Sequence, residues 1–297
     1  MQPPRILLIG KLGQVGWELR RALAPLGQLL AIDYPEIDLT DGQSITRWIR
    51  ESQPRLVVNA AAHTAVDKAE SEPERAMEMN GVAPGILAEE CRRLDAWLVH
   101  YSTDYVFDGA KHSPYVEEDR PNPLGAYGRS KLAGDQAIAQ VDGRYLILRL
   151  CWVYGARGQN FLLTMIGLAR EREKLRVVRD QIGAPTWSRM IAEATAHAAH
   201  RVLADAQSVA LKGTYHVSAA GQTSWHGFTE RIVSLMRPDD RKCREVEAIT
   251  AAEYPTAAKR PANSVMNNDK FARTFGLRLP PWEESLEAVM DELRPTP

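Results

Sequence analysis

The sequence predicts an α/β fold: a doubly wound parallel sheet with a smaller, discontinuous C-terminal domain. Short apolar runs alternate with amphipathic stretches through residues 5–150, a pattern typical of parallel strands joined by helices. A glycine-rich turn directly follows the first apolar run. Beyond residue 152 the regular alternation weakens, which indicates a second unit built differently.

The N-terminal half alternates strand and helix in a regular order. Arg5 to Ile9 is an apolar run of the kind buried in a parallel sheet, and Trp17 to Ala24 reads as an amphipathic helix. The further predicted strands are 29–32, 56–62, 97–102 and 145–150, and the further helices are 44–51, 73–93 and 126–139. With right-handed crossovers the carboxyl ends of these strands share one rim, where such sheets bind ligands.

The segment from Gly10 to Gly16 lies between the first strand and the first helix, which is the context of a dinucleotide-binding turn in a Rossmann-like sheet. Glycines allow a tight turn and let a pyrophosphate approach the free N–H groups at the helix N-terminus. The spacing is G-x-x-G-x-x-G and not G-x-G-x-x-G, so a plain strand-to-helix turn stays an alternative. Asp33 ends the second strand, where a carboxylate binds an adenosine ribose hydroxyl and disfavours a 2′-phosphate.

The C-terminal part contains predicted helices at 161–174, 187–204, 225–236 and 281–293, and short strands at 176–178 and 214–217. We assign residues 1–152 and about 187–217 to a dinucleotide-binding domain, and about 153–186 and 218–297 to a substrate-binding domain that closes over the rim. The stretch 254–268 is rich in proline, asparagine and basic residues. It suits a nucleotide diphosphate, with Arg260 a candidate for phosphate pairing, or it is a surface connector.

Composition argues against several classes of protein. The 297 residues include 37 basic and 38 acidic side chains, a formal net charge of -1, so no overall field favours nucleic acid or an anionic membrane. No apolar run approaches the roughly 20 residues of a membrane helix, and the first residues lack a signal-peptide layout. The cysteines at 91, 151 and 243 form no Cys-x-x-Cys pair, which predicts reduced thiols, a cytoplasmic location and no structural zinc.

Tyr127 and Lys131 are the candidate catalytic pair. Four residues apart on a helix, they share one face, and a cation beside a phenol lowers the tyrosine pKa from roughly 10. Such a phenol can exchange a proton near neutral pH. The spacing alone occurs on many solvated helices, but this pair follows the fourth strand and the stretch Ser102 to Asp104, and so belongs to the predicted rim.

These features together resemble the extended short-chain dehydrogenase/reductases that act on nucleotide sugars. The more specific blocks resemble, within that superfamily, the dTDP-4-dehydrorhamnose reductases. The blocks are 10–16, 59–67, 101–109, Tyr127 with Lys131, 180–186, 254–256, and Arg260 and Pro261 with Ser264. They extend from residue 6 to about residue 271, which is nearly the whole chain.

The resemblance implies reduction of the C4 ketone of dTDP-4-dehydro-L-rhamnose to dTDP-L-rhamnose, which feeds cell-surface polysaccharide, with NADPH or NADH as cofactor. Tyr127 would donate the proton, and Lys131 would hold the phenol pKa down and bind the nicotinamide ribose. Thr103 would orient the carbonyl, although its hydroxyl can equally satisfy a strand end. The cofactor positions carried over are Gly10, Gly13, Gln14, Val15, Gly16, Asp33, Asp38, Leu39, Ala62, His63, Thr64, Tyr101, Tyr127 and Lys131. The substrate positions are Thr103, Asp104, Trp152 and Arg260.

One departure from the family concerns a metal ion. Some members dimerise through magnesium held by carboxylates, and Glu18 and Glu292 match two of those positions. The third position is Arg189, and a cation there opposes magnesium binding. We therefore predict no metal site, and a homodimer is left open.

Two alternatives to this reductase remain. One is another nucleotide-sugar reductase or epimerase of the same superfamily. The other is a non-catalytic dinucleotide-binding regulatory subunit, as in a related family that regulates an adenosyltransferase. An idle subunit does not need Tyr127, Lys131 and Thr103 together, so their joint presence favours the enzyme.

Overall fold

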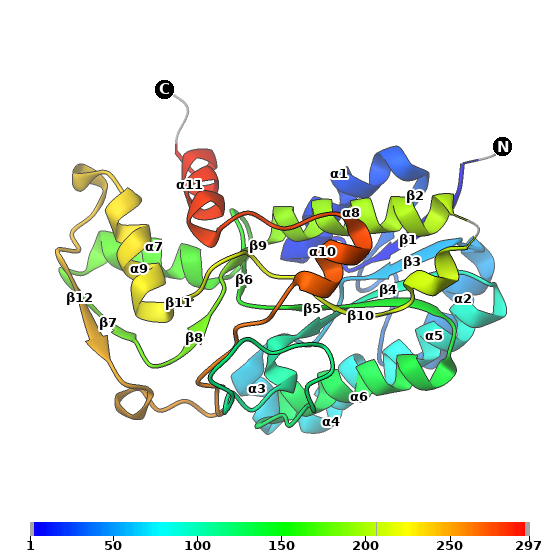
Figure 1. The fold of residues 1–297 in the computed structure, drawn as a ribbon, viewed down its shortest axis with the longest axis horizontal. Helices are drawn as coiled ribbons and strands as arrows, with labels where there is room; N and C mark the ends of the chain where they lie inside the picture. The colour runs from blue at the N-terminus through cyan, green and yellow to red at the C-terminus, as the bar shows by residue number, and fades with distance from the viewer. Residues whose placement is uncertain (1–2, 206, 295–297) are drawn as a thin grey trace.

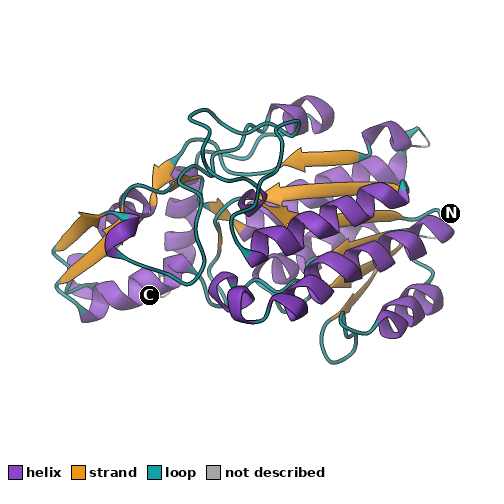
Figure 2. Ribbon diagram, turned by 90° about the horizontal axis from the view of Figure 1, so that it is seen from below, coloured by secondary structure: helices purple, strands orange, loops and turns teal. Residues whose placement is uncertain are grey.

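A six-stranded parallel sheet with helices on both faces forms the larger part of the computed structural model, which describes residues 3–205 and 207–294 (Figures 1 and 2). Its strands are β1 (Arg5–Ile9), β2 (Gln28–Ile32), β3 (Leu56–Asn59), β4 (Trp97–Thr103), β5 (Arg144–Leu150) and β10 (Gly213–His216). They lie in the order β10-β5-β4-β3-β1-β2, and every neighbouring pair is parallel. The predicted doubly wound fold is confirmed. The order reverses at β1, and such sheets bind ligands outside the strand ends at this reversal.

The inner strands β1 and β3 are buried on both faces, which explains why they are continuous apolar runs in the sequence. Ile6 and Leu8 of β1 belong to the cluster under one helical layer, and Leu7 and Ile9 belong to the cluster under the other. The first layer consists of α1 (Gln14–Leu23), α8 (Ser188–Ala204) and α10 (Asp269–Phe275). The second consists of α2 (Gly42–Ser52), α5 (Ala83–Arg93) and α6 (Ala126–Val141). Figure 1 shows the two layers above and below the strands.

Helix 73–93 was predicted as one continuous element, and the structure divides it. A π-helical turn (Glu78–Val82) separates α4 (Pro73–Met77) from α5. Pro84 has no N–H to donate to the carbonyl of Asn80, and its ring displaces that carbonyl, so the α-helical pattern cannot continue there. The displaced carbonyl packs against α6, where a Cβ on Gly134 would lie 2.1 Å from the Asn80 oxygen.

The π-helical turn aims the buried Asn80 side chain at the loop that follows β3. Its Oδ1 accepts from the N–H of His63 at 2.8 Å, and its Nδ2 donates to the His63 carbonyl and to the Ser130 hydroxyl, each at 3.0 Å. One side chain therefore joins the end of β3 to α6.

Replacing Asn80 tests this junction. Asn80→Ala leaves the buried N–H and carbonyl of His63 without partners, and we expect the free energy of unfolding to fall by about 2 to 3 kcal/mol. Urea unfolding followed by circular dichroism measures the change. Glu78→Ala, an exposed position in the same turn, is the control and is expected to change stability by less than about 0.5 kcal/mol. Equal stabilities of the two variants would contradict the assignment.

The second part of the molecule packs around its own apolar cluster, which includes Phe228 and Leu286. Its helices are α7 (Phe161–Glu171), α9 (Trp225–Leu235) and α11 (Trp282–Glu292), and its main strand pair is β7 (Lys174–Val178) with β12 (Glu245–Ile249), in parallel. The short strand pairs are β6 (Val153–Tyr154) with β9 (Thr186–Trp187), and β8 (Ile182–Gly183) with β11 (Thr223–Ser224). Figure 2 shows the strands of the large sheet pointing toward this part. The proposed domain boundaries themselves stay a prediction.

Two further expectations about the bounds of elements were wrong. Residues 60–62 form a loop and not the end of β3, and the helix predicted at 161–174 ends at Glu171 because β7 begins at Lys174. The elements missed from the sequence are α3 (Val66–Ser71), α10 and β12, and also the short strands β6, β8, β9 and β11. The partner of β12 lies far away in the sequence, and pairing with β7 forms this strand although charged residues alternate along it.

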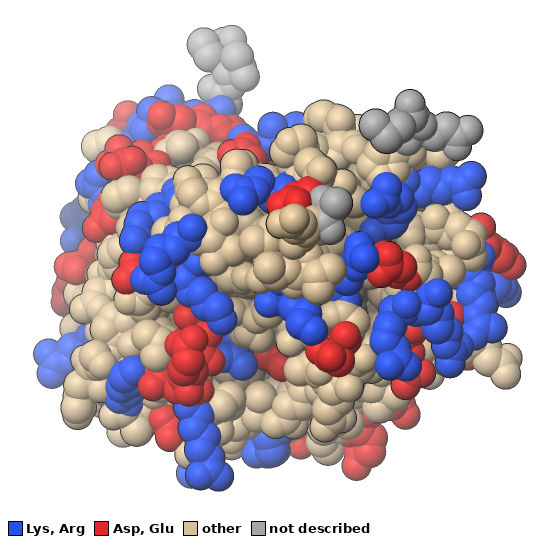
Figure 3. Space-filling view, turned by 45° about the vertical axis from the view of Figure 1, so that its right-hand side comes forward, with Lys and Arg blue, Asp and Glu red and all other residues tan. Residues whose placement is uncertain are grey.

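The surface and the helices agree with the composition. Figure 3 shows basic and acidic side chains interspersed on the face it presents. Among the described residues, no helix combines the length and the apolar character needed to cross a membrane.

Candidate functional site

Three adjoining cavities lie at the carboxyl ends of the strands. The central cavity, of about 680 Å³, lies between the turn after β1, the ends of β4 and β5, and α6. A second cavity of about 670 Å³, here called the β2-side cavity, shares Asp33, Ala61 and Met79 with it. A third of about 1010 Å³, the C-terminal cavity, shares Tyr105 and Trp225 with it. An elongated ligand can therefore extend through all three.

The glycines of the turn after β1 are required for different structural reasons. Gly10 has φ +89, and a Cβ there would lie 2.6 Å from the Ala61 nitrogen; a Cβ on Gly16 would lie 1.8 Å from the Gly10 oxygen. These two glycines are required by packing, and Gly16 does not line the central cavity. A Cβ on Gly13 would meet only the Gly10 oxygen at 3.6 Å, so this residue leaves space above the helix.

The N-terminus of α1 fits the pyrophosphate of a dinucleotide. Gly13, Gln14 and Val15 line the central cavity, no side chain caps the helix, and its first turn has no acidic residue. Free N–H groups and the helix dipole favour an anion at such a position.

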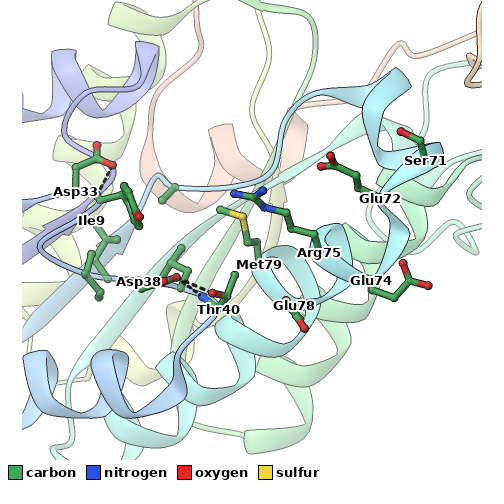
Figure 4. Close-up of a pocket in the computed structure, with 14 residues that line it drawn as sticks. Ile9, Asp33, Asp38, Thr40, Ser71, Glu72, Glu74, Arg75, Glu78 and Met79 are labelled. Atoms are coloured by element: carbon green, nitrogen blue, oxygen red, sulfur yellow. Dashed lines mark hydrogen bonds between the residues drawn. The ribbon is translucent and has the colours of Figure 1, made fainter.

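The β2-side cavity fits the adenosine end of a dinucleotide. Asp33 lies at its border, and its Oδ2 accepts from the N–H of Leu12 at 2.8 Å. Asp38 and Leu39 line this cavity and not the central one. Hydrogen bonds from the backbone and hydroxyl of Thr40 lower the pKa of Asp38, so its carboxylate is charged. Figure 4 shows Arg75 pointing into the same cavity beside Met79.

Three further predicted cofactor positions line the central cavity and a fourth, His63, does not. Ala62 and Thr64 line it, whereas His63 is buried and its backbone is bound to Asn80. Tyr101 also lines the cavity, and its hydroxyl lies 2.7 Å from the Thr195 hydroxyl of α8.

Thr103, Tyr127 and Lys131 meet at the central cavity. Thr103 is the last residue of β4, and the other two share one face of α6, as predicted. The Thr103 hydroxyl donates to Asp104 Oδ1 at 3.1 Å, and the Tyr127 ring packs edge-on to Tyr105 at a centroid distance of 5.6 Å. A hydroxyl, a phenol and an amine are thus available to one reacting carbonyl.

The expected lowering of the Tyr127 pKa was wrong. Burial raises the pKa of Tyr127 to about 12, although the Thr103 hydroxyl acts in the opposite direction. Burial also lowers the pKa of Lys131 to about 8, against the attraction of Asp135. The Lys131 amine is directed at the Tyr101 carbonyl, 2.6 Å away, and at the His100 ring, so desolvation outweighs its effect on the phenol.

Sequence reasoning missed the polar side chains beneath this pair. Asp135 Oδ2, one turn after Lys131, accepts from the Ser102 hydroxyl at 2.9 Å and from Arg149 Nε at 3.2 Å, and all three residues are buried. His100 contacts Lys131 from the middle of a fully buried strand. The sequence did contain a signal for these residues: His100 and Arg149 interrupt otherwise apolar strands. A polar group buried in this way needs hydrogen-bond partners in the interior.

Trp152 and Asp104, the predicted substrate residues, also line the central cavity. Trp152 has φ +45, and its indole stacks on Trp225 with ring centroids 3.5 Å apart and an interplanar angle of 8°. A Cβ on Gly183 would lie 2.4 Å from the same indole, so only glycine admits the ring at this place. Burial raises the pKa of Asp104 to about 6.

Arg260 lines the C-terminal cavity and not the central one. Its guanidinium forms two bonds to the Asp67 carboxylate, at 2.7 and 3.2 Å, and so joins the C-terminal loop to α3. The other basic residues of this cavity are Arg172, Lys174, Arg176 and Lys259. The cavity is therefore basic, as a nucleotide diphosphate requires.

The residues at the magnesium positions of some relatives do not fit a metal ion here. Arg189 Nε lies 3.1 Å from Glu18 Oε2, and Arg189 Nη2 lies 2.8 Å from Glu292 Oε1. The guanidinium thus neutralises both carboxylates and joins α8 to α1 and α11. A divalent cation would have to displace it against charge repulsion.

This ion-pair cluster predicts a metal-independent fold. We expect the melting temperature to be unchanged by EDTA or by added magnesium, measured by differential scanning fluorimetry. Arg189→Met leaves Glu18, which is 7% exposed, without its main partner and is expected to lower stability by about 1 to 3 kcal/mol. Arg237→Met, which removes an exposed ion pair to Asp240 outside this cluster, is the control and should change little. A fall in melting temperature on adding EDTA would contradict the prediction.

Comparisons with known proteins agree with the geometry. A family model described as the RmlD substrate binding domain matches residues 4–295. The chain is 46% identical over 294 residues to the dTDP-4-dehydrorhamnose reductase of Burkholderia thailandensis, covering 97% of this chain and 99% of that protein.

Solved structures give the same result. The crystal structure of dTDP-4-dehydrorhamnose reductase from Bacillus anthracis in complex with NADP has a TM-score of 0.87 and 34% identity, covering 98% of this chain and 100% of that one. That of the Clostridium acetobutylicum enzyme has a TM-score of 0.88 and 35% identity, covering 97% and 99%. The similarity therefore includes all the elements around the three cavities.

Proposed function

Since the chain belongs to the family of dTDP-4-dehydrorhamnose reductases, we propose that it reduces the C4 ketone of dTDP-4-dehydro-L-rhamnose to dTDP-L-rhamnose with NADPH or NADH. The observation that carries the proposal is the meeting of Thr103, Tyr127 and Lys131 at one cavity beside the N-terminus of α1. The similarity over nearly the full chain favours this reaction over an epimerase or an idle regulatory subunit.

The residues divide the chemistry between them. The nicotinamide supplies the hydride when it is bound. Tyr127 donates its proton to the ketone oxygen, and Thr103 hydrogen-bonds that oxygen and so orients the carbonyl. Lys131, as an ammonium, favours the phenolate that remains on Tyr127 and thereby assists the transfer. A phenol with a high pKa stays protonated at neutral pH, so Tyr127 carries its proton before the substrate binds.

The three cavities suggest how the two ligands lie. The adenosine of the cofactor fits the β2-side cavity, with Asp33 and Asp38, and its pyrophosphate fits the N-terminus of α1. The sugar fits the central cavity against Trp152 and Asp104. The nucleotide diphosphate of the substrate fits the basic C-terminal cavity, with Arg260 at its border.

The proposal also includes a cytoplasmic location and a small-molecule substrate, with neither nucleic acid nor membrane as partner. Cys91, Cys151 and Cys243 are buried free thiols, which a reducing compartment preserves. The homodimer considered from the sequence stays a prediction, and the ion pairs of Arg189 give it no support through magnesium.

Replacing Tyr127 tests the proposed proton donor. We expect Tyr127→Phe to lower kcat by about 10² to 10⁴-fold, because the ring is kept and only the proton is lost. The measurement follows NADPH or NADH absorbance with dTDP-4-dehydro-L-rhamnose made in situ by the enzymes that precede this step. Tyr145→Phe, which removes a hydroxyl outside the three cavities, should retain full activity. No oxidation by the wild type, or undiminished turnover by Tyr127→Phe, would refute the proposal.

Replacing Arg260 tests the proposed diphosphate site. Arg260→Ala is expected to raise KM for the nucleotide sugar about tenfold while the KM for the cofactor stays within about twofold, since one charge-assisted contact is lost. Asp67→Asn weakens the ion pair but keeps the guanidinium, and should leave the KM for the sugar nearly unchanged. If both variants raise that KM equally, Arg260 acts by holding α3 and not by binding phosphate.

A further inference from the structure

A row of buried side chains extends behind Lys131 from β3 through β4 to α6. Asn59, His100 and Lys131 are 1%, 1% and 2% exposed. Asn59 Nδ2 lies 3.2 Å from His100 Nδ1, and His100 Nε2 lies 3.1 Å from Lys131 Nζ. Asn59 and His100 are register partners on neighbouring parallel strands, so their side chains share the sheet face that α6 covers. The row ends at the central cavity.

The orientation of the Asn59 amide follows from its other contact. The N–H of Ala61 donates to Asn59 Oδ1 at 3.2 Å. A backbone N–H can only donate, so the amide oxygen must face Ala61 and the amide NH₂ must face His100. The histidine therefore meets a donor at its Nδ1.

That donor determines the tautomer of His100. An NH₂ group cannot accept, so Nδ1 must carry no proton. Burial and the neighbouring Lys131 hold the pKa of His100 well below its usual value, so the ring is neutral. A neutral imidazole with a bare Nδ1 carries its proton on Nε2, which is the nitrogen that faces Lys131.

The lysine is therefore placed opposite a donor. Its Nζ donates to the Tyr101 carbonyl at 2.6 Å and lies 3.1 Å from the Nε2–H of His100. Only an uncharged amine has the lone pair that can accept from Nε2–H, whereas an ammonium would set donor against donor. Burial acts in the same direction on the pKa of Lys131.

The other ionisable groups around the row come from three elements. On α6, the Asp135 carboxylate raises the pKa of Lys131, but it also forms an ion pair with Arg149 of β5. Tyr127 of α6 and Tyr101 of β4 both have raised pKa values and stay neutral, and Asp104 follows the end of β4. Among the described residues, the side-chain hydrogen bonds of His100 go to Asn59 and Lys131.

We propose that His100, oriented by Asn59, is a positioning residue whose Nε2–H faces Lys131 and favours the uncharged, hydrogen-bond-accepting amine over the ammonium in the free protein. Uptake of one proton from solvent breaks the contact with Nε2–H and frees the ammonium for the cavity. The consequence for turnover rests on the proposed function, whereas the tautomer of His100 is a property of the free protein. The two can therefore be tested separately.

The tautomer is tested on the wild-type protein without ligands. Protein labelled with ¹⁵N-histidine is measured by long-range ¹H–¹⁵N correlation, and the His100 signals are identified by their loss in His100→Gln. We expect a bare Nδ1 and a protonated Nε2. A protonated Nδ1, alone or with Nε2, overturns the proposal whether or not the protein reduces the sugar.

The effect on the lysine is tested through the pH dependence of kcat/KM for the cofactor, which reports the enzyme before the cofactor binds. Activity that needs the ammonium falls as the pH rises through the lysine pKa, so we expect an alkaline limb. His100→Leu removes the donor that favours the uncharged amine and should move this limb upward by about one pH unit. His100→Gln keeps an N–H within reach of Lys131 and should keep the limb close to that of the wild type.

The direction of the shift decides the outcome. A limb that moves to lower pH in His100→Leu means that the imidazole accepts from an ammonium, which overturns the proposal. An unmoved limb with a reduced kcat means that His100 only supports the fold, which overturns it as well. If His100→Leu does not fold, the histidine spectra of the wild type and the pH profile of His100→Gln still decide.

Discussion

The buried polar contacts between α6 and the sheet are the constraint on which the site depends. Lys131 and Asp135 lie one turn apart on a helix that packs against apolar strands, so each must find polar partners inside the protein. The strands provide a carbonyl and an imidazole for the lysine, and a hydroxyl and a guanidinium for the aspartate. Turning the helix about its axis would leave these groups unpaired. The same constraint directs Tyr127, one turn earlier, to the central cavity.

The sheet and its rim could be predicted because their signals are local. The inner strands β1 and β3 are buried on both faces and so appear as short apolar runs, and the helices show apolar residues at helical spacing. The pairing of β12 with β7 and the cavity that they border are not local, because the partners are distant in the chain and β12 carries alternating charges. The position of Arg260 could not be predicted for the same reason. Its hydrogen bonds to Asp67 join residues that are distant in the chain, and no sequence motif connects the two.

Spacing predicts which face a side chain occupies but not its protonation. The interval between Tyr127 and Lys131 indicated a shared helix face, and both residues do line the central cavity. It also suggested a lowered phenol pKa, whereas burial raises the pKa of Tyr127. The reason is physical: a pKa depends on all the groups and the solvent around it, and most of those arrive from other strands. The sequence did not indicate His100 as a site residue, because its hydrogen-bond partners come from β3 and α6.

The backbone at Trp152 has a consequence for redesign of the enzyme. A residue other than glycine in the left-handed region costs roughly 1–2 kcal/mol, and at φ +45 the main chain at this tryptophan carries that cost. Glycine and asparagine adopt the same conformation more readily. An engineer who replaces this residue with glycine or asparagine to admit a bulkier sugar therefore relaxes the main chain in the same step. What is lost is the indole's packing between Gly183 and Trp225, so the companion changes belong at those two positions.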